Sequence, residues 1–209
     1  MKVFYVFAAL LMAASAVSAD CAQEIDALFD GPMSSFARPP HTQVMTAFAA
    51  DGSEEAVVDQ WVETPLRYAS QTRGQAVVML IDETKMWSGP TLDGPWTPMG
   101  TPLPNGRREW QEKQDADRRA NVTEPECLGA QDLNGTAVTV YRFHTKTNPD
   151  EFGAWFGGRQ TIFVEEATGH LLRTELRDST AHYQPTPDGK TVVIDMTYDP
   201  DLKLVVPDN

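Results

Sequence analysis

The chain has few of the residues that build metal-binding or disulfide-rich domains. Its 209 residues include only two cysteines and four histidines. Two thiols are too few for a four-thiolate zinc site or for a miniprotein held together by disulfides. Basic residues are also scarce, with 17 Lys+Arg against 30 Asp+Glu and a formal net charge of −13. Because an acidic surface repels phosphate backbones, nucleic acid is not expected as a partner.

Sequence motifs of enzyme chemistry are missing as well. No Gly-x-Ser-x-Gly, His-Glu-x-x-His or Gly-x-Gly-x-x-Gly pattern occurs. His41, His144, His170 and His182 do not stand at metal-ligand spacing from one another or from a cysteine. We therefore predict no catalytic residue, no metal and no cofactor. A hydrolase that uses one of these histidines with nearby acids is the less favoured alternative.

A long apolar run occurs only at the N-terminus. Lys2 precedes the apolar residues 3–14, and the small residues Val17-Ser18-Ala19 follow. This pattern is typical of a cleavable secretory signal peptide over residues 1–19. The run is shorter than the ~20 residues that span a bilayer, so a membrane anchor is less favoured. We expect residues 20–209 to form a single soluble periplasmic domain without a transmembrane segment.

The two cysteines, Cys21 and Cys127, are predicted to form a disulfide. An exported protein folds in an oxidising compartment, and the chain offers no other pair. Closing a loop of about 100 residues stabilises a fold by ~4.7 kcal/mol at best in the chain-entropy model. A redox-active pair is less favoured, because the sequence has no Cys-x-x-Cys motif. Lipid attachment at Cys21 is not expected, since the charged Asp20 precedes it.

Most of the mature sequence alternates with the period of β-strands. Residues 21–30 first predict a short helix with Cys21, Ile25, Leu28 and Phe29 on one face. A strand, a sharp turn and a short returning strand are expected around residues 86–96. Longer strands are predicted at residues 41–50, 55–63, 66–71, 75–81, 137–144, 160–165, 170–177 and 191–199.

A charged segment, residues 106–119, interrupts the strands and predicts a second helix. Only Trp110 is strongly apolar there, so we expect slight packing and high mobility.

The order of these elements predicts an α+β fold with an antiparallel sheet. Short connections make consecutive strands antiparallel neighbours, and no alternation of strands with helices suggests a parallel sheet. Within the strands, apolar residues share one side, as Ile194, Met196 and Tyr198 do, and as Leu172 and Leu176 do. One apolar and one solvated face is typical of a single sheet that curls around something.

Three stretches of the sequence resemble a known family. They are the tryptophan-flanked turn at 87–98, the strand pair with Thr-Gly at its hairpin at 160–175, and the ending Tyr-Asp-x-x-x-Lys-x-x-x-Pro at 198–207. The segment that begins at Cys127 adds a fourth, weaker likeness. Together these stretches resemble the periplasmic lipoprotein-carrier (LolA/LolB-like) superfamily.

The resemblance implies a strongly curved antiparallel sheet, an incomplete β-barrel, with short helices packed in its concave face. In that superfamily an apolar cavity between sheet and helices holds acyl chains. Its carriers also use a strand arginine that latches the helical lid, and Arg67 is the nearest counterpart here.

Two functions follow from these observations. The favoured one is an exported, non-enzymatic protein that binds a lipid or acyl-chain ligand in an apolar cleft, with a role in lipid or lipoprotein handling in the cell envelope. The alternative is a periplasmic interaction or scaffold module with a filled core, whose partner is an envelope protein. For the favoured function, the candidate cleft-lining residues are Phe48, Trp61, Leu80, Tyr141, Phe143, Phe163, Leu172, Leu176, Ile194, Met196 and Tyr198.

Overall fold

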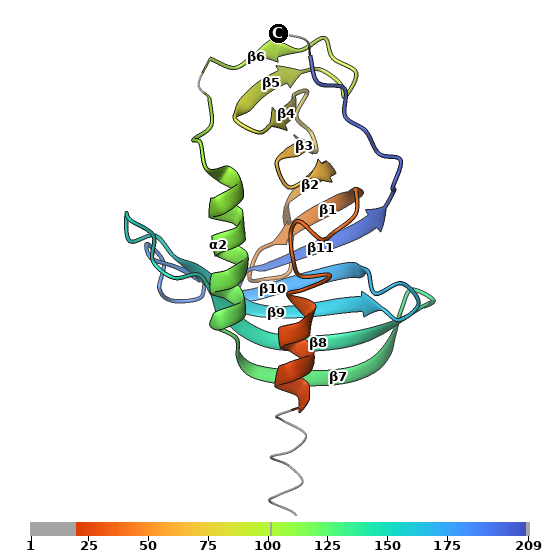
Figure 1. The fold of residues 1–209 in the computed structure, drawn as a ribbon, viewed down its shortest axis with the longest axis vertical. Helices are drawn as coiled ribbons and strands as arrows, with labels where there is room; N and C mark the ends of the chain where they lie inside the picture. Colours follow the sequence, from red (N-terminus) through yellow and green to blue (C-terminus); the bar gives the residue numbers. More distant parts are fainter. Residues whose placement is uncertain (1–19, 101, 208–209) are drawn as a thin grey trace, which may run out of the picture.

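The computed structural model describes residues 20–100 and 102–207, so the predicted signal peptide lies outside the described residues. Residues 20–28 form a short helix, called the N-terminal helix below, and turns follow it to residue 38. The remaining elements (Figure 1) are β1 (His41–Phe48), β2 (Glu54–Thr64), β3 (Arg67–Thr72), β4 (Val78–Asp82), β5 (Lys85–Gly89), β6 (Thr97–Pro98), α2 (Arg107–Ala120), β7 (Thr123–Leu133), β8 (Thr136–Lys146), β9 (Phe156–Glu165), β10 (Leu171–Ala181) and β11 (Thr191–Tyr198).

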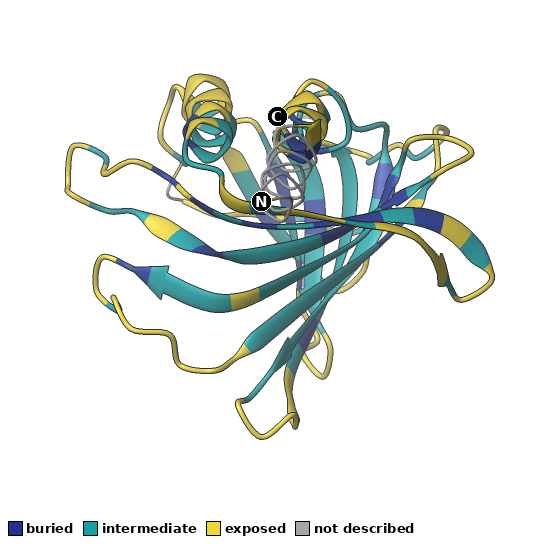
Figure 2. Cartoon of the chain, turned by 90° about the horizontal axis from the view of Figure 1, so that it is seen from below, coloured by how far each residue is buried: buried dark blue, intermediate teal, exposed yellow. Residues whose placement is uncertain are grey.

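All these strands belong to one unclosed antiparallel sheet. Their order is β6-β5-β4-β3-β2-β1-β11-β10-β9-β8-β7. Within β1–β6 and within β7–β11, consecutive strands are neighbours because their connections are short. The two groups meet where β1 pairs with β11, from His41 opposite Tyr198 to Phe48 opposite Thr191. The sheet curves strongly, and both helices lie on its inner side (Figures 1 and 2), which we call the concave face. The predicted fold class is therefore confirmed.

The sequence pattern did not predict one strand, β7. Thr123–Leu133 contains Pro125 and Gly129, both of which disfavour a regular strand. The structure tolerates them because β7 is the last strand of the sheet and its register shifts at two places. Asn134 and Gly135 then adopt positive φ angles of 55° and 89°, as a tight hairpin to β8 requires.

The larger core lies between the N-terminal helix and the concave face. Ile25 of the helix and Phe29, directly after its end, pack against Phe143 and Ile162, and all four side chains are at most 7% exposed. The face predicted for this helix is thus confirmed. So is the disulfide between Cys21 and Cys127, whose Cα atoms are 5.6 Å apart and which ties the helix to β7.

A second core lies on the opposite, convex face, over strands β2 to β5. Ala69, Leu80 and Trp87 are buried there under the C-terminal segment, residues 199–207, which contributes Leu204 and Val206. Glu63 anchors that segment by accepting a hydrogen bond from the Leu204 amide at 3.0 Å. The expectation of one apolar and one solvated face was therefore wrong for this half of the sheet, because a distant segment covers its convex side.

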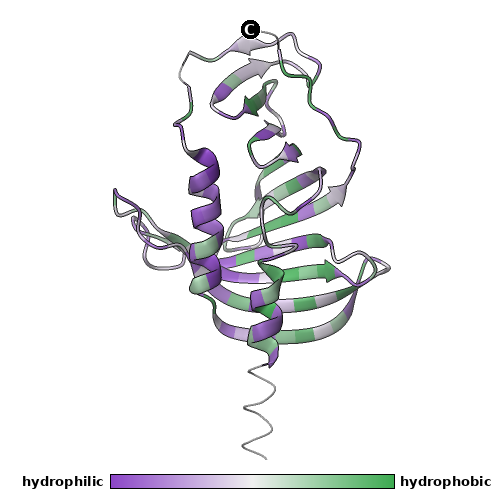
Figure 3. Cartoon of the chain, viewed as in Figure 1, coloured by the Kyte–Doolittle hydropathy of each residue, from purple (hydrophilic) through white to green (hydrophobic). Residues whose placement is uncertain are grey.

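Helix α2 crosses the concave face with little apolar packing, as predicted. Asp117 is its only buried residue, and it accepts hydrogen bonds from the amide and side chain of Asn148 at 3.2 and 2.7 Å. Arg119 holds α2 to the N-terminal helix through Asp26 and Asp30, with N–O distances of 2.6 Å. These contacts all involve the second half of α2, and its hydrophilic character is visible in Figure 3. Among the described residues, no helix combines the length and apolarity needed to span a membrane.

Candidate functional site

Two adjoining cavities open between α2 and the concave face. The first, about 350 Å³ and called the arginine cavity here, is lined by Ser35, Arg38, His41, Gln43, Gln60, Val62, Pro65, Tyr68, Arg107, Trp110, Gln111 and Arg118. The second, about 330 Å³ and called the glycine cavity, is lined by Trp110, Gln111, Gln114, Arg118, Thr145, Lys146, Thr147, Phe156, Gly157, Gly158, Gln160 and Leu176. Because Trp110, Gln111 and Arg118 of α2 line both, the cavities adjoin under the helix, and together we call them the groove.

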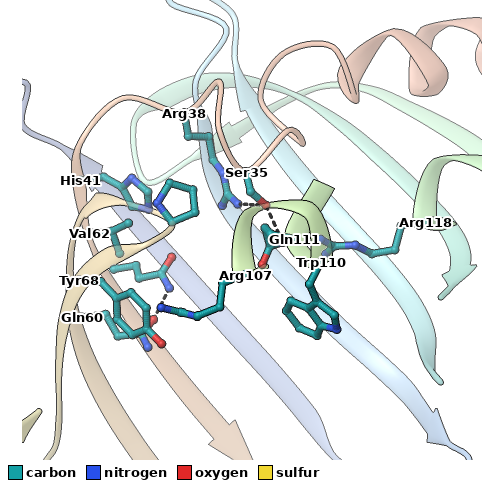
Figure 4. A pocket seen from close by; sticks show the side chains of 12 residues that line it. Ser35, Arg38, His41, Gln60, Val62, Tyr68, Arg107, Trp110, Gln111 and Arg118 are labelled. Carbon is teal, nitrogen blue, oxygen red and sulfur yellow. Dashed lines mark hydrogen bonds between the residues drawn. The ribbon is translucent and has the colours of Figure 1, made fainter. Parts of the chain in front are cut away.

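The arginine cavity sits where the chain enters the sheet. The turns after the N-terminal helix carry Ser35 and Arg38, and β1 to β3 supply the wall opposite α2 (Figure 4). His41, the first residue of β1, is 4% exposed and its Nδ1 lies 2.8 Å from the Pro39 carbonyl oxygen. Burial lowers the pKa of His41 below its ordinary value, and the nearby Arg38 lowers it further. The imidazole is therefore held in its neutral form.

A polar network joins α2 to the turns after the N-terminal helix. Asp115 accepts hydrogen bonds from the Ser35 amide at 2.9 Å and from the Ser35 hydroxyl at 3.1 Å, and it also pairs with Arg118. Gln111 donates to the Ser35 hydroxyl at 3.0 Å. This network fixes the position of the helix over the groove by hydrogen bonds rather than by apolar contacts.

Two glycines of β9, Gly157 and Gly158, line the glycine cavity. A Cβ atom on Gly158 would lie 2.9 Å from the Arg177 carbonyl oxygen, and one on Gly157 would lie 2.7 Å from Lys146 Cβ. Larger residues at these positions would force neighbouring backbone to move. Most of the surface that lines this cavity is apolar. Phe156 and Trp110, at its rim, are 49% and 55% exposed.

Six of the predicted cleft-lining residues do point to the concave face. Only Leu176 among them lines the groove. The other five lie in or against the core beneath the N-terminal helix, where the protein's own side chains cover them: Tyr141, Phe143, Ile194, Met196 and Tyr198.

The remaining candidates do not face the groove, and their placement corrects the prediction. The strand register puts Phe48, Trp61, Leu80 and Phe163 on the convex face. Leu172 is the extra residue of a bulge, since Leu171 pairs with Val164 and Arg173 with Phe163. That bulge moves Leu171, rather than Leu172, into the core.

Arg67 does not latch the helix either. Its guanidinium binds Asp82 at 2.8 Å and Glu63 at 3.5 Å, both on the sheet. The sequence prediction did not include the arginines that do line the groove, because an apolar cleft is indicated by apolar residues alone. A signal was present in β1 and β2, where Gln43 and Gln60 interrupt the inward-facing series and pair with each other.

A third cavity, about 390 Å³, lies apart from the groove at the edge of the sheet. It is lined mainly by Met86, Trp87, Trp96, Pro98, Met99 and Pro207. Across the described ranges 20–100 and 102–207, no three His, Cys, Asp or Glu side chains gather as a metal site would need.

Comparison with known proteins identifies the fold. No family model matches the chain, and no curated protein matches its sequence. The structure is similar to that of lipoprotein LppX from Mycobacterium tuberculosis, with a TM-score of 0.51 and 11% identity over 85% of this chain and 93% of that one. Lower scores relate it to LprF from Mycobacterium bovis (0.47, 13% identity, 89% and 97% covered) and to a LolA superfamily protein from Nitrosomonas europaea (0.30, 13%, 87% and 94%).

At such low identity, the likeness to LppX shows the fold alone. That fold is the curved antiparallel sheet with helices on its concave face, as the sequence motifs implied. The resemblance drawn from the sequence is thus confirmed for the fold, whereas the ligand and the site need arguments from this chain's own residues.

Proposed function

We propose that this chain is a non-enzymatic binding protein that holds a lipid or another amphiphile in the groove under α2. The observation that carries the proposal is that the protein's own side chains leave this part of the concave face open. The N-terminal helix fills its half of the face with Ile25 and Phe29, but α2 roofs two cavities of about 350 and 330 Å³. Volumes of this order suit a small ligand.

The glycine cavity suits the apolar part of such a ligand. Trp110, Phe156 and Leu176 present carbon surface to it, and Gly158 adds no side chain that would fill it. Covering apolar surface stabilises a complex by about 25 cal/mol per Å². A bound chain would remove the exposed parts of Trp110 and Phe156 from water. Burial of this apolar surface supplies the binding free energy without a chemical reaction.

Export is part of the proposal. Residues 1–19 have the pattern of a signal peptide, and a disulfide is typical of oxidising compartments such as the periplasm. We expect the mature, soluble chain to work there in lipid or lipoprotein handling.

Native mass spectrometry of protein purified from its own cell envelope tests this function. We expect a reproducible added mass that organic extraction removes, and renewed binding when decanoate is titrated into the extracted protein. Phe156→Ala should weaken that binding severalfold, because the rim of the glycine cavity loses its ring. Phe152→Ala is the matched control, since Phe152 is 84% exposed and lines neither cavity. Absence of any bound amphiphile in both experiments would contradict the proposal.

A second candidate function is an interaction module for an envelope protein. The third cavity favours it, because this apolar hollow at the edge of the sheet leaves Met99 40% exposed. Site-specific crosslinking from position 99 in the periplasm would then give one defined adduct. The same crosslinker at Phe152 should not give it.

A further inference from the structure

The arginine cavity is lined by basic and neutral residues, although the whole chain is acidic. The protein carries 30 acidic and 17 basic residues, yet none of the residues that line this cavity is acidic. Three of them are arginines: Arg38, Arg107 and Arg118. Like charges gathered in a partly enclosed space raise the local potential and attract an anion.

Arg38 is the most exceptional of the three. Its Nε is buried and has no hydrogen-bond partner among the described residues. Its other nitrogens have only weak contacts, 3.4 Å from the Ser35 hydroxyl and 4.0 Å from the Met196 sulfur. No carboxylate of the described residues forms an ion pair with it, and burial lowers its pKa. An unpaired buried cation is costly, so folding alone does not account for this arrangement.

Arg107 reaches the same cavity from the first turn of α2. Its guanidinium donates to the backbone carbonyl of Glu83 and, within the part of the chain described, pairs with no carboxylate. Arg118 differs, because Asp115 neutralises it. Arg38 and Arg107 therefore supply the uncompensated charge, and they belong to separate elements that face one cavity (Figure 4).

Neutral groups complete a polar pocket around these two arginines. Gln43 donates its side-chain amide to the Gln60 oxygen, and the amide group of Gln60 has no acceptor among the described residues. Tyr68 lines the same wall. His41 is held neutral and adds no charge of its own. The set combines cations with hydrogen-bond donors, which is the chemistry that recognises carboxylate or phosphate oxygens.

From this lining we infer that the arginine cavity binds the carboxylate or phosphate group of an amphiphile through Arg38 and Arg107, while the apolar chain of the ligand extends into the glycine cavity. This inference rests on the proposed function and adds the chemical class of the ligand. The shared residues Trp110, Gln111 and Arg118 show that the two cavities adjoin, so that one ligand with a charged head and an apolar tail can reach from one into the other.

Isothermal titration calorimetry of the full mature chain with three probes tests the inference. Decanoate, 1-decanol and inorganic phosphate separate the charged head from the apolar chain. We expect decanoate to bind about tenfold or more tightly than 1-decanol, since hydrogen bonds to charged groups exceed neutral ones by that order. Equal affinity for the two would overturn the anionic site and leave the proposed function standing.

The other outcomes are also decisive. Binding of phosphate without either ten-carbon compound would support an anion site for a free ion and contradict the proposed function. Failure of all three probes to bind would overturn both.

Variants locate the anion site. Arg38→Gln and Arg107→Gln should each remove most of the preference for decanoate over 1-decanol. Arg107 is half-buried on a helix held by other contacts, so its variant tests the site even if Arg38→Gln unfolds the chain. Arg108→Gln is the matched control, because its side chain lies over the Phe36 ring and does not line the cavity. An unchanged preference in the Arg107 variant, or an equal loss in the Arg108 control, would overturn the assignment.

Discussion

Phe143 shows how one side chain connects the N-terminal helix to the sheet. It is fully buried, and its ring centroid lies 6.2 Å from that of Phe29. Phe143→Ala should lower the free energy of unfolding by about 3–5 kcal/mol, because the lost apolar contacts leave a cavity. Urea denaturation measures this, with Phe152→Ala as a control that should stay within about 0.5 kcal/mol of the wild type. Similar losses in both variants would show that the helix does not pack as described.

His41 gives the protein a pH dependence with a definite sign. Because its folded pKa is lowered from 6.5, the unfolded chain takes up a proton below about pH 6.5 that the folded chain does not. Stability should therefore fall as the pH drops from 7 toward 5, by at most about 1.4 kcal/mol per pH unit from this group. Arg38 and Tyr198 lie near the ring, and both residues are retained in the variant. The unfolding free energy of His41→Gln should depend less steeply on pH, and identical slopes would count against a buried neutral His41.

Individual residues were predictable from the sequence where the strand was regular. The alternation of Ile194, Met196 and Tyr198 correctly placed these side chains on the inner face. Leu172 was misplaced because a bulge shifts the register by one residue, and alternation alone does not reveal a bulge. Arg38 was missed because its importance depends on the absence of a partner, which only the three-dimensional arrangement shows.

The N-terminal helix depends on the disulfide as well as on its apolar face. The bond between Cys21 and Cys127 joins it to an edge strand across a sequence separation of 106 residues. Replacing both cysteines by serine should cost about 2–5 kcal/mol of unfolding free energy. Denaturation under oxidising conditions compares the double variant with the wild type, and adding a reductant should destabilise only the wild type. A double variant as stable as the wild type would show that apolar packing alone secures the helix.

The elements were mostly predictable because their patterns are local. Both helices and the strands with clear alternation lie close to their expected positions. β7 was missed since Pro125 and Gly129 mask its pattern, although a tight hairpin at Asn134-Gly135 joins it to β8. The slight packing of α2 followed from Trp110 being its only strongly apolar residue, whereas the high mobility expected of α2 stays a prediction.

The molecule as a whole places its two cores on opposite faces of one curved sheet. The N-terminal helix covers the concave face over β8 to β11, and residues 199–207 cover the convex face over β2 to β5. The curved sheet itself was foreseen from short connections and from the sequence motifs. The second core was not, because it brings together the C-terminal segment and strands more than 100 residues away, and sequence patterns do not record such contacts. The groove lies on the part of the concave face that the N-terminal helix does not cover, under α2.

The five tryptophans make this arrangement testable in one spectrum. Trp110 lines the groove, whereas Trp61, Trp87 and Trp96 belong to the core on the convex face. In a titration of ¹⁵N-labelled protein with decanoate, followed by two-dimensional NMR, we predict that the indole N–H signal of Trp110 shifts and saturates while those of Trp61, Trp87 and Trp96 stay in place. Shifts confined to the three convex-face tryptophans, or no shift at all, would contradict a ligand-binding groove under α2.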